Sequence, residues 1–189
     1  MGADSLIVLR PGNHGTVDLP EIVLEGNALI TYNSSTEPKS DYRHAYGING
    51  NYEFEMRGQS SQFVYLTATN TVNRFILGRQ GHSWRLRADV ELALNGDVTV
   101  LSAGADPPEP AADLILNAAN AISPSATLEL NGSDSNTLVT VNADNTVFGL
   151  FINGVQQPDG IYDSSESWLS GSGSLTVKGP PQATLLILM

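Results

Sequence analysis

The sequence contains no cysteine, and only two of its 189 residues, Lys39 and Lys178, are lysine. The missing thiol excludes disulfide bonds, thiolate metal sites and a cysteine nucleophile. No apolar stretch reaches the roughly 20 residues that a helix needs to span a bilayer. The first residues, MGADSLIVLRPG, lack the charged start and the full apolar core of a secretory signal peptide. If the protein is exported, we expect its export signal to lie outside these residues.

Basic residues are scarce in one half of the chain. Residues 1–87 contain eight Lys/Arg and eight Asp/Glu, whereas residues 88–189 contain one Lys and twelve Asp/Glu, which gives the net charge of −11. Binding to nucleic acid or to anionic lipid depends on basic side chains that neutralise phosphate groups. We therefore expect no nucleic-acid partner, and we interpret the acidic charge mainly as a contribution to solubility.

Short alternating runs predict an all-β protein. Glycine, serine, threonine, asparagine and valine are abundant, as in proteins built from strands and turns. In residues 85–94 the apolar side chains fall on every second position, which places them on one face of a pleated strand. The predicted strands cover residues 5–9, 21–32, 52–56, 63–68, 74–78, 84–94, 97–101, 113–117, 126–132, 136–142, 147–154 and 174–177.

Turn residues separate these runs. The dipeptide Asn-Gly, which tolerates the positive φ of tight turns, occurs at 49–50, 95–96, 131–132 and 153–154. In the alanine-rich segment 111–122 we predict a strand around Leu114 and Leu116, followed by a turn at 118–122. The segment 103–113 contains three prolines, which cannot sit inside a central strand, and we interpret it as a surface loop or as a linker between two domains.

The tripeptide Leu-Asn-Gly occurs at 94–96 and again at 130–132, each time after an alternating run. Short strands with such turns fit a solenoid, in which each coil buries its apolar face on the next. They fit a two-sheet sandwich equally well, and the pattern alone leaves both open.

The last third of the chain resembles a known family. The stretch LILNAANAISPSATLELNGSDSNTLVTV (114–141) resembles the autotransporter-associated β-strand repeat, and residues 150–177 resemble the unit that commonly closes such proteins. The matching residues of that closing unit are Asn153, Gly154, Gly160, Tyr162, Trp168, Gly171, Gly173 and Val177. The resemblance implies a parallel β-helix that a Gram-negative-type bacterium exports to its cell surface or matrix, with a structural or adhesive role.

The C-terminal segment GPPQATLLILM (179–189) resembles the opening of a PEP-type sorting signal, whose longer transmembrane stretch and arginine cluster do not follow here. We therefore expect the chain to be a fragment of a longer exported protein, with membrane attachment only through an anchor beyond it.

The predicted regions are an N-terminal β region (1–105), a β-repeat region (106–178) and the truncated sorting signal (179–189). The expected location is the extracellular space or cell surface of a bacterium.

Basic and aromatic residues concentrate in two clusters, KSDYRHAYG (39–47) and NRFILGRQGHSWRLRAD (73–89). Arginine and aromatic side chains bind sugars through bidentate hydrogen bonds and stacking. Polysaccharide lyases use the same residue types for catalysis, when they abstract a proton beside the carboxylate of a uronate. The alternative is that these arginines pair with acids on a solvated sheet face. The candidate carbohydrate-binding residues are Arg43, His44, Tyr46, Arg79, His82, Trp84, Arg85 and Arg87.

Calcium is the only cofactor that the sequence brings into consideration. Asp134, Asp144 and Asp159 lie in segments rich in oxygen ligands, although none of these segments matches a known calcium motif. Aspartate and asparagine are also the residues that tight turns prefer, so we expect turns first and calcium as the alternative.

The fold we predict is a right-handed parallel β-helix, with a β-sandwich or jelly roll as the alternative. The function we predict is a non-catalytic structural or adhesive domain that contacts glycans or other surface proteins, with a carbohydrate-binding module or lyase as the alternative.

Overall fold

The computed structural model describes residues 5–9, 16–32, 41–58, 62–79, 86–90, 96–101, 114–132 and 139–179. Every regular element in these residues is a β-strand, so the described part of the chain contains no helix that could cross a membrane. The strands are β1 (Ser5–Leu9), β2 (Thr16–Leu19), β3 (Ile22–Val23), β4 (Ala28–Tyr32), β5 (Asp41–His44), β6 (Ile48–Asn49), β7 (Glu53–Gly58), β8 (Gln62–Leu66), β9 (Arg74–Arg79), β10 (Leu86–Val90), β11 (Asp97–Leu101), β12 (Leu114–Leu116), β13 (Thr127–Asn131), β14 (Val139–Val141), β15 (Asn145–Val147), β16 (Gly149–Ile152), β17 (Val155–Gln156), β18 (Gly160–Tyr162), β19 (Leu169–Ser170) and β20 (Leu175–Val177).

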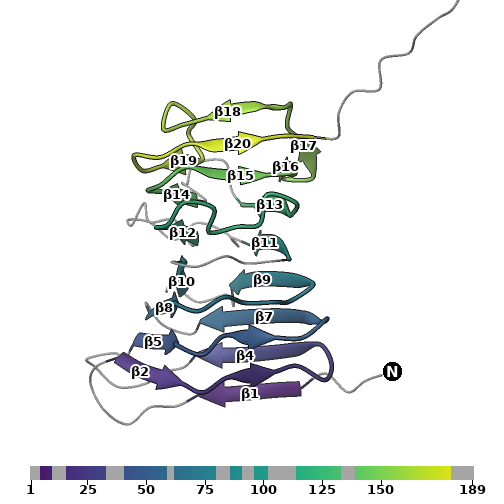
Figure 1. Ribbon diagram of the computed structural model, residues 1–189, viewed down its shortest axis with the longest axis vertical. Helices are drawn as coiled ribbons and strands as arrows, with labels where there is room; N and C mark the ends of the chain where they lie inside the picture. Colours follow the sequence, from purple (N-terminus) through teal and green to yellow (C-terminus); the bar gives the residue numbers. More distant parts are fainter. Residues whose placement is uncertain are drawn as a thin grey trace, which may run out of the picture.

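The strands stack into two long sheets that run from one end of the molecule to the other (Figure 1). The larger sheet has the order β1-β4-β7-β9-β11-β13-β16-β17, and the smaller has the order β2-β5-β8-β10-β12-β14-β19. Every pair in them is parallel except β16 with β17. Two short sheets, β3-β6 and β15-β20-β18, form a third side at the two ends.

Parallel pairing decides between the two predicted architectures. A β-sandwich joins neighbouring strands by antiparallel hairpins, whereas parallel neighbours need a crossover of a dozen or more residues. Here the chain leaves one sheet, runs through the other, and returns to pair beside its own previous strand. Side chains of adjacent coils that hydrogen-bond to each other are 22 to 30 positions apart in the sequence. The predicted parallel β-helix is therefore confirmed, and the β-sandwich is not what the chain forms.

The core consists of rows of apolar side chains that lie in register from coil to coil. In the larger sheet one row is Ala28, Phe54, Phe75, Val98, Leu128 and Leu150, and all of these are buried. The rings of Phe54 and Phe75 stack with their centroids 6.4 Å apart. Since side chains alternate across a strand, the residues between these rows face outward and tolerate polar side chains. The alternation of apolar and polar residues in the sequence therefore corresponds to side chains that face the inside and the outside of the solenoid.

One predicted strand is wrong in its extent. Residues 21–32 form two strands, β3 and β4, with a bend at Glu25 and Gly26 between them. The reason is a corner of the coil, because Leu24 donates its backbone N–H to Asn49 of the next coil, 2.7 Å away, and the chain then turns into the larger sheet. Several short strands, β2, β5, β6, β17, β18 and β19, were not predicted at all, and the predicted strand 147–154 joins the last residue of β15 to β16. The strand at Leu114 and Leu116 and the turn after it are confirmed.

The proline-rich segment 103–113 lies outside the described residues. On either side of it the ladders continue, since β10 pairs with β12 and β11 pairs with β13. The same two sheets therefore contain strands from both sides of this segment.

Antiparallel strands cover the C-terminal end of the solenoid. A hairpin with positive φ at Asn153 (50°) and Gly154 (76°) turns β16 into β17. Strand β18 returns antiparallel onto β20. The rings of Tyr162 and Trp168 lie 5.7 Å apart and pack against the edge of the core. The two aromatics and the antiparallel strands thus cover the last coil, where an open parallel edge would otherwise pair with further strands.

Candidate functional site

Three strands of the smaller sheet present a polar row on the outer surface near the N-terminal end. Asp18 of β2, Arg43 of β5 and Tyr65 of β8 lie in register in adjacent coils. Arg43 donates from Nε to Asp18 Oδ1 at 2.6 Å and from Nη2 to Asp18 Oδ2 at 2.9 Å. This two-bond geometry fixes the orientation of both side chains, which remain about half exposed. The hydrogen bonds from Arg43 also lower the pKa of Asp18, so the carboxylate is ionised at neutral pH.

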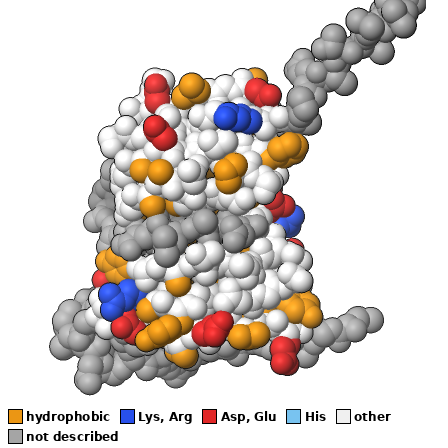
Figure 2. Space-filling view, in the orientation of Figure 1, with side chains coloured by type: hydrophobic (Ala, Val, Ile, Leu, Met, Phe, Trp, Pro, Cys, Tyr) orange, Lys and Arg blue, Asp and Glu red, His pale blue; other side chains and the backbone are white. Residues whose placement is uncertain are grey.

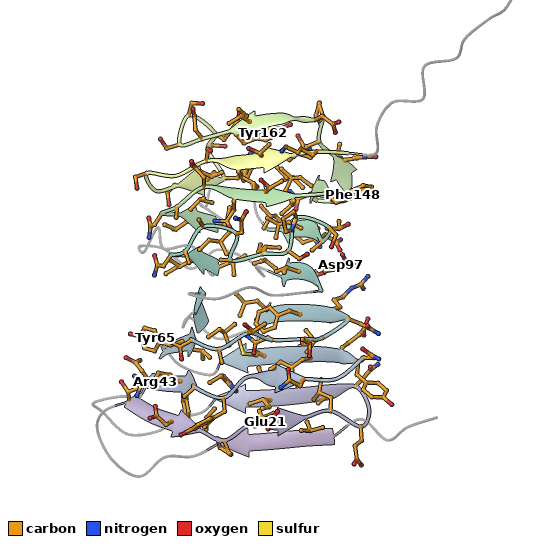
Figure 3. All side chains as sticks on the ribbon, in the orientation of Figure 1. Glu21, Arg43, Tyr65, Asp97, Phe148 and Tyr162 are labelled. Atoms are coloured by element: carbon orange, nitrogen blue, oxygen red, sulfur yellow. The ribbon has the colours of Figure 1, made fainter. Side chains whose placement is uncertain are left out.

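An open pocket of about 420 Å³ lies beside this ion pair. Its walls come from the same three coils, and its lining residues are Thr16, Arg43, Ala45, Tyr65 and Thr67. Figure 3 shows Tyr65 directly above Arg43 on the same side of the solenoid. Hydroxyl groups, a guanidinium and an aromatic ring therefore share one concave surface, with the partner carboxylate of Asp18 beside it.

His44 does not belong to this pocket, because the alternation of β5 turns it inward. It lies in register with Leu19 and Leu66, is completely buried, and makes an edge-on contact with Phe54, with ring centroids 6.3 Å apart. Burial lowers the pKa of His44 to about 4, so the imidazole is neutral at physiological pH. A neutral side chain in the core cannot contact a ligand at the surface.

The other predicted carbohydrate-binding residues scatter. Tyr46 is 67% exposed in the bend that follows β5. Arg79 ends β9 in the larger sheet, whereas Arg87 lies on β10 in the smaller sheet, in register with Phe63. His82, Trp84 and Arg85 lie outside the described residues. Among the members of this set that the structure describes, only Arg43 lines the pocket.

Sequence reasoning missed Thr16, Tyr65 and Thr67. The only local signal is the alternation of β2 and β8, in which Asp18 and Tyr65 fall on outward positions. Which outward residues of different coils become neighbours depends on the register between strands that are more than 20 residues apart.

Two of the three predicted calcium ligands, Asp144 and Asp159, serve as hydrogen-bond acceptors in turns. Asp144 Oδ1 accepts from the backbone N–H and from the hydroxyl of Ser174, both at 2.9 Å. Asp159 Oδ1 accepts from the N–H of Gly179 at 3.0 Å. Asp134 lies outside the described residues, and within those that are described no three acidic or histidine side chains gather as a metal site would require. Both described aspartates thus act as turn residues.

Two buried asparagines form a structural motif that the sequence analysis did not recognise. Asn70 and Asn145 are each 1% exposed and occur in the matching pentapeptides ATNTV (68–72) and ADNTV (143–147). Each Oδ1 accepts a backbone N–H of the preceding coil, from Ile48 at 2.9 Å and from Ile122 at 3.3 Å. Each Nδ2 donates to the carbonyl two residues earlier in its own coil. Each asparagine therefore satisfies backbone groups of two neighbouring coils.

The described surface carries few charges on the face shown in Figure 2, and its apolar side chains are scattered and not gathered in one patch. A second exposed ion pair, between Arg74 Nη1 and Glu53 Oε1 at 3.6 Å, lies on the larger sheet, away from the pocket. No protein-family profile matches the chain, and neither a curated protein nor a solved structure is significantly similar to it.

Proposed function

We propose that this chain is a non-catalytic structural and adhesive domain at the cell surface or in the extracellular matrix of a bacterium. The observation that carries the proposal is the unbroken pair of parallel ladders, capped at the C-terminal end. Each coil is tied to the next by backbone bonds and by buried side chains, so the solenoid is a stiff body with long, regular outer faces. A stiff solenoid of this kind can hold other domains at a distance from the cell, and its outer faces can attach to other molecules. The resemblance of residues 114–177 to the autotransporter-associated repeat supports the same location.

The state of the polar residues favours binding over catalysis. An arginine acts as a general base only after losing its proton, and the ion pair with Asp18 stabilises the protonated form of Arg43. His44, the other candidate base in this cluster, is buried in the core. A carbohydrate-binding role is therefore the second candidate, and the pocket between β2, β5 and β8 is the observation that favours it.

Antibody labelling of cells that carry the gene at its natural locus tests the location. A purified antibody against the described solenoid should label intact cells or their extracellular material, and brief protease treatment of intact cells should remove the label. A cytoplasmic protein of the same cells provides the control for lysis. Labelling that requires permeabilised cells would contradict the proposal.

A further inference from the structure

We propose that the pocket formed by Thr16, Arg43, Ala45, Tyr65 and Thr67 binds one uncharged pyranose unit of a glycan. This inference rests on the carbohydrate-binding role given above as the second candidate. The pocket volume of about 420 Å³ lies within the range of roughly 300–1,000 Å³ that is usual for small-ligand sites. The pocket is open on one side, so a sugar that belongs to a longer chain can enter it while the rest of the glycan continues along the surface.

The polar groups match the hydroxyl groups of a sugar. Neighbouring hydroxyls of a pyranose both donate and accept hydrogen bonds, and they need fixed acceptors and donors at short spacing. Arg43 brings its guanidinium N–H groups to the pocket wall, and the ion pair with Asp18, beside the pocket, holds this side chain in place. Thr16 and Thr67 add hydroxyl groups from the two outer coils of the pocket. Because these groups are already oriented, little conformational entropy is lost when a ligand binds.

The apolar part of the wall matches the carbon face of a sugar. A pyranose ring carries C–H groups on its faces, and Tyr65 contributes an aromatic ring to the pocket wall. Tyrosine combines a large apolar surface with few rotatable bonds and a polar tip, which suits a ligand that has both apolar and polar parts. Ala45 also lines the pocket and adds a small apolar side chain.

The charges select an uncharged sugar. The carboxylate of Asp18 and the guanidinium of Arg43 cancel each other, so Arg43 offers no net positive field to a uronate or a sialic acid. Asp41, a second acidic residue, lies in register with Thr16 on the adjacent strand. Residues 1–87, which include every pocket residue, contain eight basic and eight acidic residues, so this half of the chain has no net positive charge that would attract acidic glycans.

The first experiment is a printed array of neutral and acidic glycans, probed with the purified full chain. Binding confined to neutral glycans is the expected result. A chain that binds no glycan, or that binds only acidic ones, overturns the proposal.

The neutral glycan with the strongest signal is then titrated into variants by isothermal calorimetry. Tyr65→Ala removes the ring and Asp18→Asn removes the ion pair that orients Arg43, and each should weaken binding about tenfold or more. Tyr65→Phe keeps the ring and should restore most of the affinity. The matched control is Glu53→Gln, which disrupts an equally exposed ion pair on the other sheet and should leave binding unchanged.

Unchanged affinity in Tyr65→Ala and Asp18→Asn would place the sugar elsewhere and overturn the assignment. Far-UV circular dichroism and the urea midpoint of each variant show whether it remains folded. The surface labelling of intact cells is independent of this result. A loss of glycan binding with labelling retained would refute the pocket alone, whereas a loss of labelling would refute the proposed location.

Discussion

The buried histidine should make the solenoid sensitive to mild acid. His44 lies in an otherwise aliphatic row between Leu19 and Leu66, with no exposed surface. Its pKa falls from 6.5 to about 4 because burial penalises the imidazolium form. Replacing it by leucine, His44→Leu, continues the row of leucines and removes the titrating group.

The size of the effect follows from proton linkage. Because the folded-state pKa lies below that of the unfolded chain, the unfolded chain takes up a proton first as the pH falls. The stability associated with neutral His44 is therefore complete above pH 6.5 and is lost progressively as the pH falls from 6.5 toward 4. Between pH 7 and pH 5 this loss amounts to about 2 kcal/mol, and over the whole window to about 3 kcal/mol.

The assay is equilibrium unfolding in urea at pH 7 and pH 5, monitored by far-UV circular dichroism. The wild-type chain should lose about 2 kcal/mol more between the two pH values than His44→Leu does. All other titratable groups are shared, so their contributions cancel in this difference. Leu66→Ala is the matched core control and should cost about 2–5 kcal/mol at both pH values alike. Equal pH-dependent losses in the wild type and in His44→Leu would refute the reasoning.

Two further predictions concern the corners of the coils, and both are measured as the free energy of unfolding in urea at pH 7. Asn145→Ala leaves buried backbone groups without a partner and should cost about 1–3 kcal/mol, whereas Asn142→Ala, which removes an exposed hydrogen bond, should cost about 0.5 kcal/mol or less. Equal losses would show that the buried asparagine is not a structural bridge. Gly171 has φ +103°, and a Cβ there would collide with the carbonyl group of Val141, so Gly171→Ala should cost more than about 2 kcal/mol. At Gly154 a Cβ meets nothing within 4 Å, so only the positive φ opposes Gly154→Ala, at about 1 kcal/mol, and the reverse order of the two losses would contradict the packing argument.

The candidate site was predictable only in part. The basic and aromatic composition of residues 39–47 pointed to Arg43, because arginine beside aromatic residues is typical of sugar-binding surfaces. It pointed equally to His44, which the structure buries. In β5 the residues alternate Asp-Tyr-Arg-His, so the local pattern separates two faces but does not tell which one is inside. Contact with Leu19 and Leu66 in the adjacent coils decides it, because these side chains draw Tyr42 and His44 into the core.

The sequence by itself determined that the chain is built from short strands and turns. The alternation of apolar residues, the Asn-Gly turns and the absence of a helical period are local properties, and a strand such as β13 shows the expected inside-outside pattern residue by residue. The tertiary structure decided which strands pair, and hence that Thr16, Arg43, Tyr65 and Thr67 meet in one pocket. The physical reason is that the register between coils depends on the length and geometry of every corner, including the buried bonds of Asn70 and Asn145. A period of two along a strand carries no information about that register.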